Sequence, residues 1–475
     1  MEIVKKTWNK KRIGIIAAIV ACLCILAIEA IVVVGSNGDR KLNAQLKLAD
    51  RYLDELDYEA AIAAYEAAIE IEPRCEAAYL GMAEAYKALG EYEKALETLE
   101  TGYDATGSEK IQEALDELKA YLEEQNADHV MVWNDPNLEA AMREVTGITD
   151  RDIMLSDVKG IRELDLSEKE ISNIEALSEL TNLRSLRLLD NNISDVSPLS
   201  KLINLEELWL HNNNISDISS LSGLTNLVNI SFDGNNISDL SPLSHLTNLG
   251  YLQFSDNNIS DIKPLSSLKN LKRLWIRGNN ISDVSPLSGL TDLESLDLSN
   301  NNISDLSPLS GLTKLNTLSL GDNNISDVSS LSGLTNLAHL SLNDNNISEV
   351  SSLNCLVNLE SLWLAGNNIS DVSPLSGLVK LESLSLSENE ISVISSLSGL
   401  ENLEYLSLFE NNISDVSPLS GLTNLNFLEL EYNNISDVSS LSGLTNLQEL
   451  YLSGNNISDY TPVSFVPKLF VFGWQ

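Results

Sequence analysis

The last two-thirds of the sequence repeat every 22 residues, and this period limits the possible folds more than any other feature. The template is L-x-x-L-x-L-x-x-N-x-I-S-D-V-S-P-L-S-G-L-T-N. Its first Leu recurs from Leu183 to Leu447, with Ile161 in that place in the first copy, so the region 161–468 holds fourteen repeats. A unit this short cannot bury its apolar face alone, and neighbouring copies must stack to share one core. We therefore expect a solenoid.

One copy, residues 403–424, indicates how each coil is built. Leu406 and Leu408 alternate with aromatic or polar residues, which is the period of a strand with one buried face. Apolar residues then follow at a spacing of three, which favours a short 3₁₀ segment: Ile413, Val416, Leu419 and Leu422. Ser417 is expected to cap this segment and Pro418 to occupy its first position. The copies predict an α/β solenoid with a parallel concave sheet and short 3₁₀ convex turns.

The 22-residue period and the wording N-x-I-S-D-x-S-P-L resemble the leucine-rich repeats of the internalins and related surface proteins of Gram-positive bacteria. Residues 133–160 resemble the helical amino-terminal cap of those proteins, and we assign 126–160 to such a cap. The resemblance implies a leucine-rich repeat horseshoe in which asparagines such as Asn411 turn inward and bond to the neighbouring coil. Residues 469–475 are expected to form a partial repeat or carboxy-terminal cap that begins with Leu469, Phe472 and Trp474.

Residues 42–107 repeat with a 34-residue period and resemble the tetratricopeptide repeat, which is a pair of helices. The matching consensus residues are Leu48, Ala49, Tyr52, Tyr58, Ala61, Tyr65, Ala68 and Pro73 in the first copy and Met82, Ala83, Tyr86, Gly90, Tyr92, Ala95 and Leu99 in the second. Residues 109–125 predict a charged amphipathic helix that caps this pair of repeats. The helical region 36–125 is either a spacer or dimerisation module or a peptide-binding groove.

A basic cluster precedes an apolar run at the amino terminus, and it consists of Lys5, Lys6, Lys10, Lys11 and Arg12. Residues 13–35 would reach roughly 34 Å as a helix, which is enough to cross a hydrocarbon core of about 30 Å. We expect an uncleaved transmembrane signal anchor, with residues 1–12 in the cytoplasm and the repeats outside the cell membrane. A cleaved signal peptide stays open, and so does a lipoprotein signal, because IVAC at 19–22 would place the lipid on Cys22.

The chain is strongly acidic, with 69 Asp and Glu against 30 Lys and Arg and a formal net charge of −39. Such a surface repels phosphates, so we expect no nucleic-acid binding. The four cysteines predict neither a disulfide framework nor a metal site, because two lie in the apolar run and two lie far apart in sequence. The four histidines are scattered, and no nucleophile–base pair, phosphate loop or paired-carboxylate motif occurs. We expect no enzymatic activity and no cofactor.

Two features that recur in nearly every copy could be a modification site or a metal-binding site. NNIS contains an N-glycosylation sequon. Its first Asn is also expected to turn inward and bond to the neighbouring coil, and its second to shape the turn. This structural explanation is favoured. The Asp that follows forms a column from Asp195 to Asp459. The column suits either weak calcium binding or capping of the helical turns, and capping is favoured.

Template positions three, five, seven and eight lie on or beside the concave strand face, and they vary between copies. They hold nine of the thirteen Trp, Tyr and Phe residues between 161 and 468. Exposed aromatic side chains on a curved sheet are typical of binding anchors, although cross-strand packing also uses them. The register predicts two clusters. The first holds Trp209, His211, Tyr251, Arg273, Trp275 and Arg277, and the second holds Trp363, Tyr405, Phe409, Phe427, Tyr432 and Tyr451.

These features together predict a membrane-anchored, outward-facing binding protein. Its expected partner is a protein that occupies the concave face. Binding of a cell-wall or host glycan is the alternative, since Trp and Tyr rings also stack on sugar rings. A purely structural surface spacer is the third hypothesis.

Overall fold

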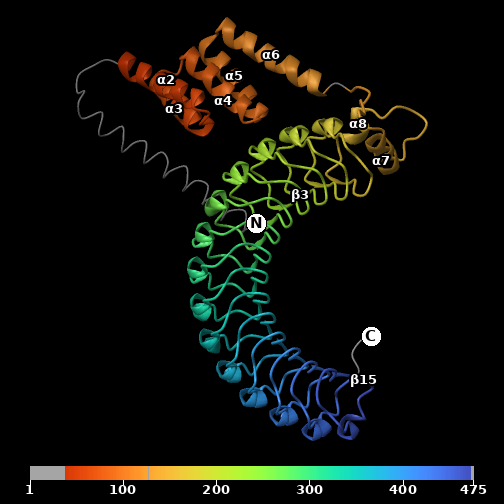
Figure 1. Ribbon diagram of the computed structural model, residues 1–475. Coiled ribbons are helices and arrows are strands. Elements are labelled where there is room, and N and C mark those ends of the chain that lie inside the picture. The colour runs from red at the N-terminus through yellow and green to blue at the C-terminus, as the bar shows by residue number, and fades with distance from the viewer. Residues whose placement is uncertain (1–37, 127, 472–475) are drawn as a thin grey trace, which may run out of the picture. The chain divides into compact units, whose positions relative to one another are not determined.

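The computed structural model describes residues 38–126 and 128–471, and the chain forms two compact units, Met1–Asp128 and His129–Gln475 (Figure 1). The two units have separate hydrophobic cores. The expected membrane span 13–35 and the basic tail 1–12 lie outside the described residues. Within the described ranges, no helix has the length and apolar character that crossing a membrane requires.

The helices described in the amino-terminal unit are α2 (Gly38–Asp54), α3 (Tyr58–Ile71), α4 (Glu76–Ala88), α5 (Tyr92–Thr106) and α6 (Glu109–Asn126). α2 packs on α3 and α4 packs on α5, which gives two helical repeats followed by α6. Tyr65 is buried against Gly81, where any β-carbon would overlap its ring, and its Oη donates to Asp50 Oδ1 at 2.7 Å. The absence of a side chain at Gly81 therefore lets the helices approach closely enough to bury an aromatic ring.

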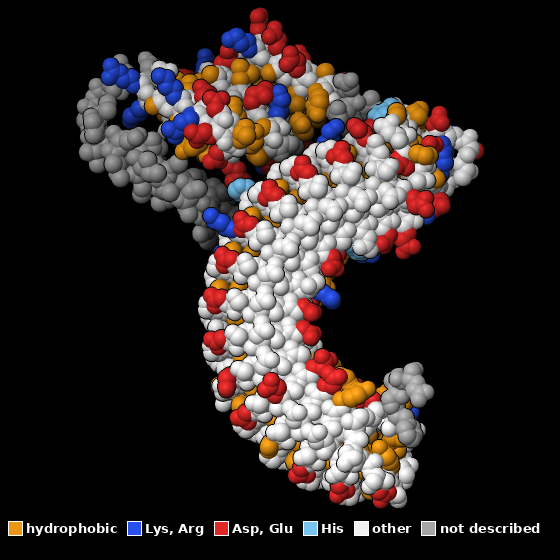
Figure 2. Space-filling model, viewed as in Figure 1, with side chains coloured by type: hydrophobic (Ala, Val, Ile, Leu, Met, Phe, Trp, Pro, Cys, Tyr) orange, Lys and Arg blue, Asp and Glu red, His pale blue; other side chains and the backbone are white. Residues whose placement is uncertain are grey.

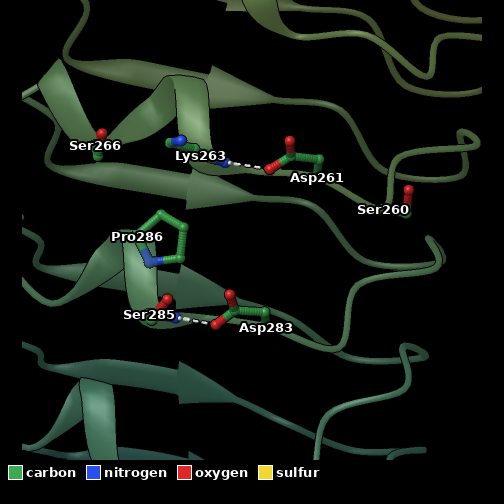
Figure 3. Close-up of a pocket in the computed structure, with 7 residues that line it drawn as sticks. All are labelled: Ser260, Asp261, Lys263, Ser266, Asp283, Ser285 and Pro286. Carbon is green, nitrogen blue, oxygen red and sulfur yellow. Dashed lines mark hydrogen bonds between the residues drawn. The ribbon is translucent and has the colours of Figure 1, made fainter.

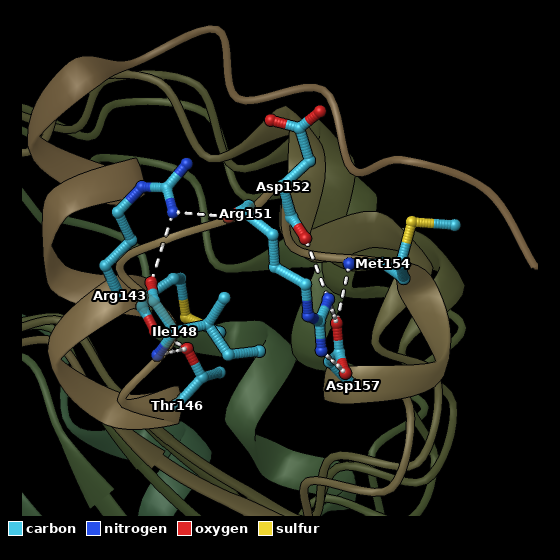
Figure 4. A network of polar contacts seen from close by, with 8 residues as sticks. Arg143, Thr146, Ile148, Arg151, Asp152, Met154 and Asp157 are labelled. Carbon is cyan, nitrogen blue, oxygen red and sulfur yellow. Dashed lines mark hydrogen bonds and ion pairs between the residues drawn. The ribbon is translucent and has the colours of Figure 1, made fainter.

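The solenoid unit begins with a cap that contains α7 (Pro136–Thr146) and α8 (Leu155–Val158). Arg143 Nη1 donates to the carbonyls of Ile148 and Arg151 at 3.1 and 2.9 Å, which fixes the loop between the two helices (Figure 4). The Arg151 guanidinium binds both carboxylate oxygens of Asp157 at 2.7 Å. Leu138 of α7 is fully buried on the core of the first coil, so the cap covers the otherwise exposed end of the stack.

Asp135 joins this cap to the first repeat. Its Oδ1 accepts from Asn137 N and Leu138 N at 2.8 and 3.1 Å, which caps α7. Its Oδ2 accepts from Ser172 N and Asn173 N at 2.7 and 3.0 Å. Burial opposes the charge, but these backbone donors outweigh it and lower the pKa of Asp135 to about 2.

Fifteen parallel strands follow in sequence order and form one sheet. They are β1 (Glu163–Asp165), β2 (Ser185–Arg187), β3 (Glu207–Trp209), β4 (Asn229–Ser231), β5 (Tyr251–Gln253), β6 (Arg273–Trp275), β7 (Ser295–Asp297), β8 (Thr317–Ser319), β9 (His339–Ser341), β10 (Ser361–Trp363), β11 (Ser383–Ser385), β12 (Tyr405–Ser407), β13 (Phe427–Glu429), β14 (Glu449–Tyr451) and β15 (Lys468–Phe470). Each strand pairs in register with the next, as Leu208 does with Ile230. The predicted parallel solenoid is confirmed.

Short 3₁₀ segments alternate with the strands, also as predicted. They are η1 (Glu175–Glu179), η2 (Ser197–Lys201), η3 (Ser219–Leu221), η4 (Ser241–Leu243), η5 (Lys263–Ser267), η6 (Ser285–Leu287), η7 (Ser307–Leu309), η8 (Ser329–Gly333), η9 (Ser351–Cys355), η10 (Ser373–Gly377), η11 (Ser395–Gly399), η12 (Ser417–Gly421), η13 (Ser439–Gly443) and η14 (Thr461–Val463). Within this unit the strands line the inner side of an arc and the 3₁₀ segments its outer side (Figure 1). The helical turns need more room than strands spaced about 4.8 Å apart, so the stack curves.

The expected asparagine ladder is present inside the solenoid. Asn213 Nδ2 donates to the carbonyls of Leu188 and Leu210 at 2.9 and 3.1 Å, while its Oδ1 accepts from Ile193 N at 2.9 Å. The same three contacts recur in later copies as far as Asn455. Each inward amide therefore bonds to backbone groups of its own coil and of the preceding one.

The exposed aspartate column caps the 3₁₀ segments. Asp261 Oδ1 accepts from Lys263 N, and Asp283 Oδ1 accepts from Ser285 N, both at 2.8 Å (Figure 3). The predicted capping role of the column is confirmed, whereas the cap predicted at Ser417 is wrong. Ser417 is already the first residue of η12, and Asp415 two residues earlier supplies the acceptor at 2.9 Å. A carboxylate reaches this N–H because the chain turns sharply between the two residues.

The last coil is shorter than the sequence period predicts. Lys468 pairs with Glu449, so the final step spans 19 residues instead of 22. Pro467 directly follows the buried Val466, and β15 starts at once. Leu469 therefore occupies the middle of β15 and not the first template position expected for it. Phe472 and Trp474 lie outside the described residues.

Candidate binding face

Each strand turns its central residue into the core and presents its first and third residues to the concave side. These outward residues are template positions three and five, and position four is buried throughout β2 to β14. Because the strands are parallel and in register, residues at one position form a continuous row across the sheet. The face is therefore set by the variable residues alone.

The first predicted cluster contains three rings in contact. Trp209 and Tyr251 lie 5.7 Å apart between ring centroids, and Tyr251 and Trp275 lie 5.6 Å apart. The rings of Trp209 and Tyr251 meet across the intervening strand β4, where Asn229 and Ser231 occupy the outward positions. All three rings are half-buried. Cross-strand packing thus covers part of each ring and leaves the rest exposed to solvent.

The basic side chains predicted for the first cluster lie beside these three rings. Arg273 and Arg277 are exposed beside Trp275. His211 Nδ1 lies 3.3 Å from Ser231 Oγ, and burial lowers the pKa of His211 against the opposing charge of Asp190. His211 is therefore mostly neutral at pH 7.

Sequence reasoning missed Arg187, whose guanidinium lies 5.8 Å from the Trp209 ring centroid. Arg187 occupies the same template position as Trp209 in the preceding copy, so the register could have identified it. The N-terminal aromatic cluster, as we call Trp209, Tyr251 and Trp275, therefore already carries a cation of this chain. That cation partly occupies the ring surface that a ligand would use.

A polar network that was also not predicted lies beside these rings. Tyr251 Oη donates to Gln253 Oε1, and Gln253 Nε2 donates to Asp233 Oδ2. Ser255 N donates to Asp233 Oδ1 at 2.6 Å. Burial raises the pKa of Asp233 to about 6 despite these donors, and the charge of Asp256 adds to the effect. The charge on this part of the concave face thus changes near neutral pH.

The second predicted cluster forms a longer row. Ring centroids of Trp363 and Tyr405 lie 5.5 Å apart, Tyr405 and Phe427 stack at 4.6 Å, and Phe427 and Tyr451 lie 5.4 Å apart. Phe470 stacks on Tyr451 at 4.3 Å and extends the row to β15. Sequence reasoning missed Phe470 because the final coil is three residues short. We call these five residues the C-terminal aromatic row.

Phe409 and Tyr432 do not join that row. They form a separate edge-on pair, with centroids 5.6 Å apart, at the turns that follow β12 and β13. Tyr432 has a positive φ of 52° and is 51% exposed. An exposed ring on a conformationally unfavourable residue is not needed for the core.

Polar residues, most of them Ser or Thr, separate the two aromatic groups. The outward residues of β7, β8 and β9 are Ser295, Asp297, Thr317, Ser319, His339 and Ser341. Trp275 and Trp363 are thus four strand spacings apart, which is about 19 Å. Among the described residues, no group of three or more His, Cys, Asp and Glu side chains is arranged to hold a metal ion. The face offers two aromatic surfaces joined by a hydroxyl-rich floor.

Comparison with known families identifies both kinds of repeat. The leucine-rich repeat family, matched as pairs of copies, covers residues 203–245, 247–289, 291–333, 335–377, 379–421 and 423–464. The tetratricopeptide repeat family matches residues 52–106. Internalin InlF from Listeria monocytogenes is 33% identical, and the alignment covers 72% of this chain and 96% of that one with a TM-score of 0.61. The chain belongs to the internalin-like leucine-rich repeat proteins.

Two other solved structures show how widely this internalin-like fold is shared. A leucine-rich repeat protein from Leptospira interrogans is 25% identical, with 64% of this chain and 93% of that chain covered and a TM-score of 0.54. A plant peptide hormone receptor, RGFR1 in complex with RGF2, is 21% identical, with 66% and 62% covered and a TM-score of 0.54. No curated protein matches the chain in sequence.

Membership in this family sets the general role of the internalin-like chain. Leucine-rich repeat proteins generally mediate protein–protein interaction, and the fold is typically a non-enzymatic binding scaffold. A fold by itself does not fix a ligand, so the partner must be argued from the side chains of the face.

Proposed function

We propose that this chain is a membrane-anchored protein of the bacterial cell surface that binds a protein partner through its concave face. One observation carries the proposal: two groups of half-buried aromatic rings occupy the variable positions of an otherwise polar sheet. Half-exposed Trp and Tyr rings are the residues most often found as energetic anchors of interfaces. The basic tail and the apolar run 13–35 support the anchor, with the repeats outside the cell.

The separation of the two aromatic groups favours a protein over a small ligand. A gap of about 19 Å is too wide for one small molecule to contact both groups, but a typical protein interface covers it easily. The hydroxyl-rich floor between them supplies hydrogen-bonding groups, which are common in the wetter parts of interfaces. The plant peptide hormone receptor RGFR1, which shares the fold, was solved in complex with RGF2, and this agrees with a partner of the protein class.

Replacing anchor residues tests the proposal directly. Trp209→Ala, Trp275→Ala and Trp363→Ala, made singly in the full-length chain, should leave the fold intact because each ring is only half-buried. Capture of a crosslinked or co-purified protein partner should fall at least tenfold for each variant, since anchor side chains contribute about 2 kcal/mol or more. Phe465→Ala is the control, because Phe465 is 40% exposed yet lies in the loop after η14, not on a concave position.

The outcome also decides between the proposed partner and the alternative. Undiminished capture by all three Trp variants would reject the concave face as the binding surface. Binding of the full-length chain on a glycan array, together with absence of any captured protein, would instead support the glycan hypothesis. Loss of capture in the Phe465 variant as well would point to general destabilisation of the solenoid.

A further inference from the structure

Carboxylates surround the C-terminal aromatic row. On β10 to β15 and in the turns after them, the charged residues at template positions three, five, seven and eight are Glu388, Glu410, Glu429, Glu431, Glu449 and Lys468. Lys468 Nζ lies 2.5 Å from Glu449 Oε1, so this lysine is already paired. Figure 2 shows acidic and hydrophobic side chains side by side on the concave edge toward the carboxy terminus.

From this arrangement we propose that the C-terminal aromatic row accepts a basic segment of the protein partner. Arg or Lys side chains of that segment lie over the ring faces that stacking within the row leaves open, and they pair with Glu429, Glu431 and Glu410. The assignment rests on the proposed function and specifies the chemistry of the ligand at one end of the face. A cation held over an aromatic ring and next to a carboxylate gains from both interactions.

Among the residues that the structure describes, no cation of this chain lies over the rings of this row. Arg187 lies over Trp209 in the N-terminal aromatic cluster. In the described part of the chain, no Lys or Arg lies over Trp363, Tyr405, Phe427, Tyr451 or Phe470. The two ends of the face therefore differ, because an arginine of this chain already lies over a ring at the N-terminal end and, among the described residues, none lies over a ring at the C-terminal end. This difference would orient a partner along the sheet.

The electrostatic effect of the carboxylates reaches the rings. Burial raises the pKa of the Tyr451 phenol, and the charges of Glu449, Glu429 and Glu431 raise it further. Burial likewise raises the pKa of Tyr405, with Glu429 as the next cause. Negative charge that disfavours a phenolate at these rings favours a cation at the same place.

The size of the row sets the length of the segment. Six strands span five spacings, or about 24 Å. An extended peptide of eight residues covers about 26 Å, and every second side chain faces the same side. A peptide of four arginines alternating with four serines is therefore a suitable probe, and the same peptide with glutamate in place of arginine is its control.

Calorimetric titration of the full-length chain in a neutral detergent, at 0.1 M salt, tests the assignment. We expect the arginine peptide to bind and the glutamate peptide not to bind. Glu429→Gln combined with Glu431→Gln should weaken arginine-peptide binding at least tenfold, while Gln at 429 still accepts from Ser407 Oγ. Phe427→Leu should weaken binding at least threefold, because Leu keeps the apolar contact and removes the ring face.

A charge-matched control separates this site from general attraction to an acidic chain. Asp371→Asn combined with Asp437→Asn removes the same charge from the aspartate column, and Asn keeps the cap. At 0.1 M salt, charges farther than about 10 Å are largely screened, so this variant should bind as the parent does. Equal weakening by the Asp and Glu variants, or no arginine-peptide binding at all, would overturn the assignment. In that case, loss of partner capture by Trp209→Ala and Trp275→Ala would still support the proposed function.

Discussion

Single residues within one repeat divide sharply between structural and exposed roles, and the adjacent asparagines of NNIS show this well. Asn323 is buried, and its Nδ2 donates to Leu298, Leu320 and Gly321 carbonyls at 3.1 Å each. Its Oδ1 accepts from Ile303 N at 2.9 Å. Asn324 is exposed and contributes its backbone N–H to the stack. The sequon residue is thus the dispensable one of the two.

Replacing each asparagine by alanine should separate these roles. Asn323→Ala leaves one buried N–H and several carbonyls without their partner, so the free energy of unfolding should fall by about 2–4 kcal/mol. Asn324→Ala should change it by less than about 0.5 kcal/mol. Urea denaturation followed by circular dichroism measures both. Similar losses for the two variants would show that the ladder does not carry the stability assigned to it.

The 22-residue register predicted which residues lie on the concave face, but it did not predict which side chains contact one another. The register placed Trp363, Tyr405 and Phe427 on one side of the sheet, as the structure has them. The sequence prediction grouped Phe409 and Tyr432 with this row, although they hold template positions seven and eight, in the turns after the strands, where they contact each other instead. Asp233 was missed because burial, not residue type, makes it unusual. Local pattern predicts which side a residue faces, whereas neighbours decide what it contacts.

At the scale of elements, the capping helix and the first coil are joined through one carboxylate. Asp135 caps α7 and also accepts from Ser172 N and Asn173 N. Sequence pattern predicted a helical cap but not this link, since Asp135 and Ser172 are 37 residues apart. The shortened last coil was missed for a related reason. The pattern continued through Val466, and only the pairing of β15 with β14 fixes the register beyond it.

Acid should weaken the attachment of the cap in a defined pH range. The pKa of Asp135 is about 2 in the folded chain and about 3.9 when unfolded, so its contribution is complete above pH 4. It is lost as the pH falls from about 4 to 2, and it amounts to about 2 kcal/mol. Asp135→Asn should remove this pH-dependent part and lower stability at pH 7.

Urea unfolding at a series of pH values measures the effect, with tryptophan fluorescence as the signal. Asp150→Asn is the matched control, because Asp150 is an exposed residue of the same cap region. The control should retain the parent's slope between pH 4 and pH 2. An unchanged slope in the Asp135 variant would mean that other carboxylates govern acid unfolding.

The whole molecule combines two units of very different core size. The solenoid core is one continuous cluster from Met131 to Val466. The helical unit instead holds two small clusters, one around Tyr65 and one around Leu99. Stability in stacked repeats grows with the number of interfaces, so the short helical stack should be the weaker unit. We therefore expect two unfolding transitions, with the helical unit first.

Gly81→Ala should affect only the first of these transitions. A β-carbon at this position would overlap the ring of Tyr65, which is fully buried and bonded through Oη to Asp50. Overpacking of this kind costs about 1–3 kcal/mol, which lowers the midpoint of a unit of this size by roughly 4 °C or more. Scanning calorimetry of the full-length chain in neutral detergent resolves the two transitions.

Glu84→Ala, at an exposed position on the same helix, should leave both midpoints nearly unchanged because its surface ion pair contributes little. A joint shift of both midpoints in the Gly81 variant would show that the units unfold as one, and that the helices contribute directly to the stability of the binding face.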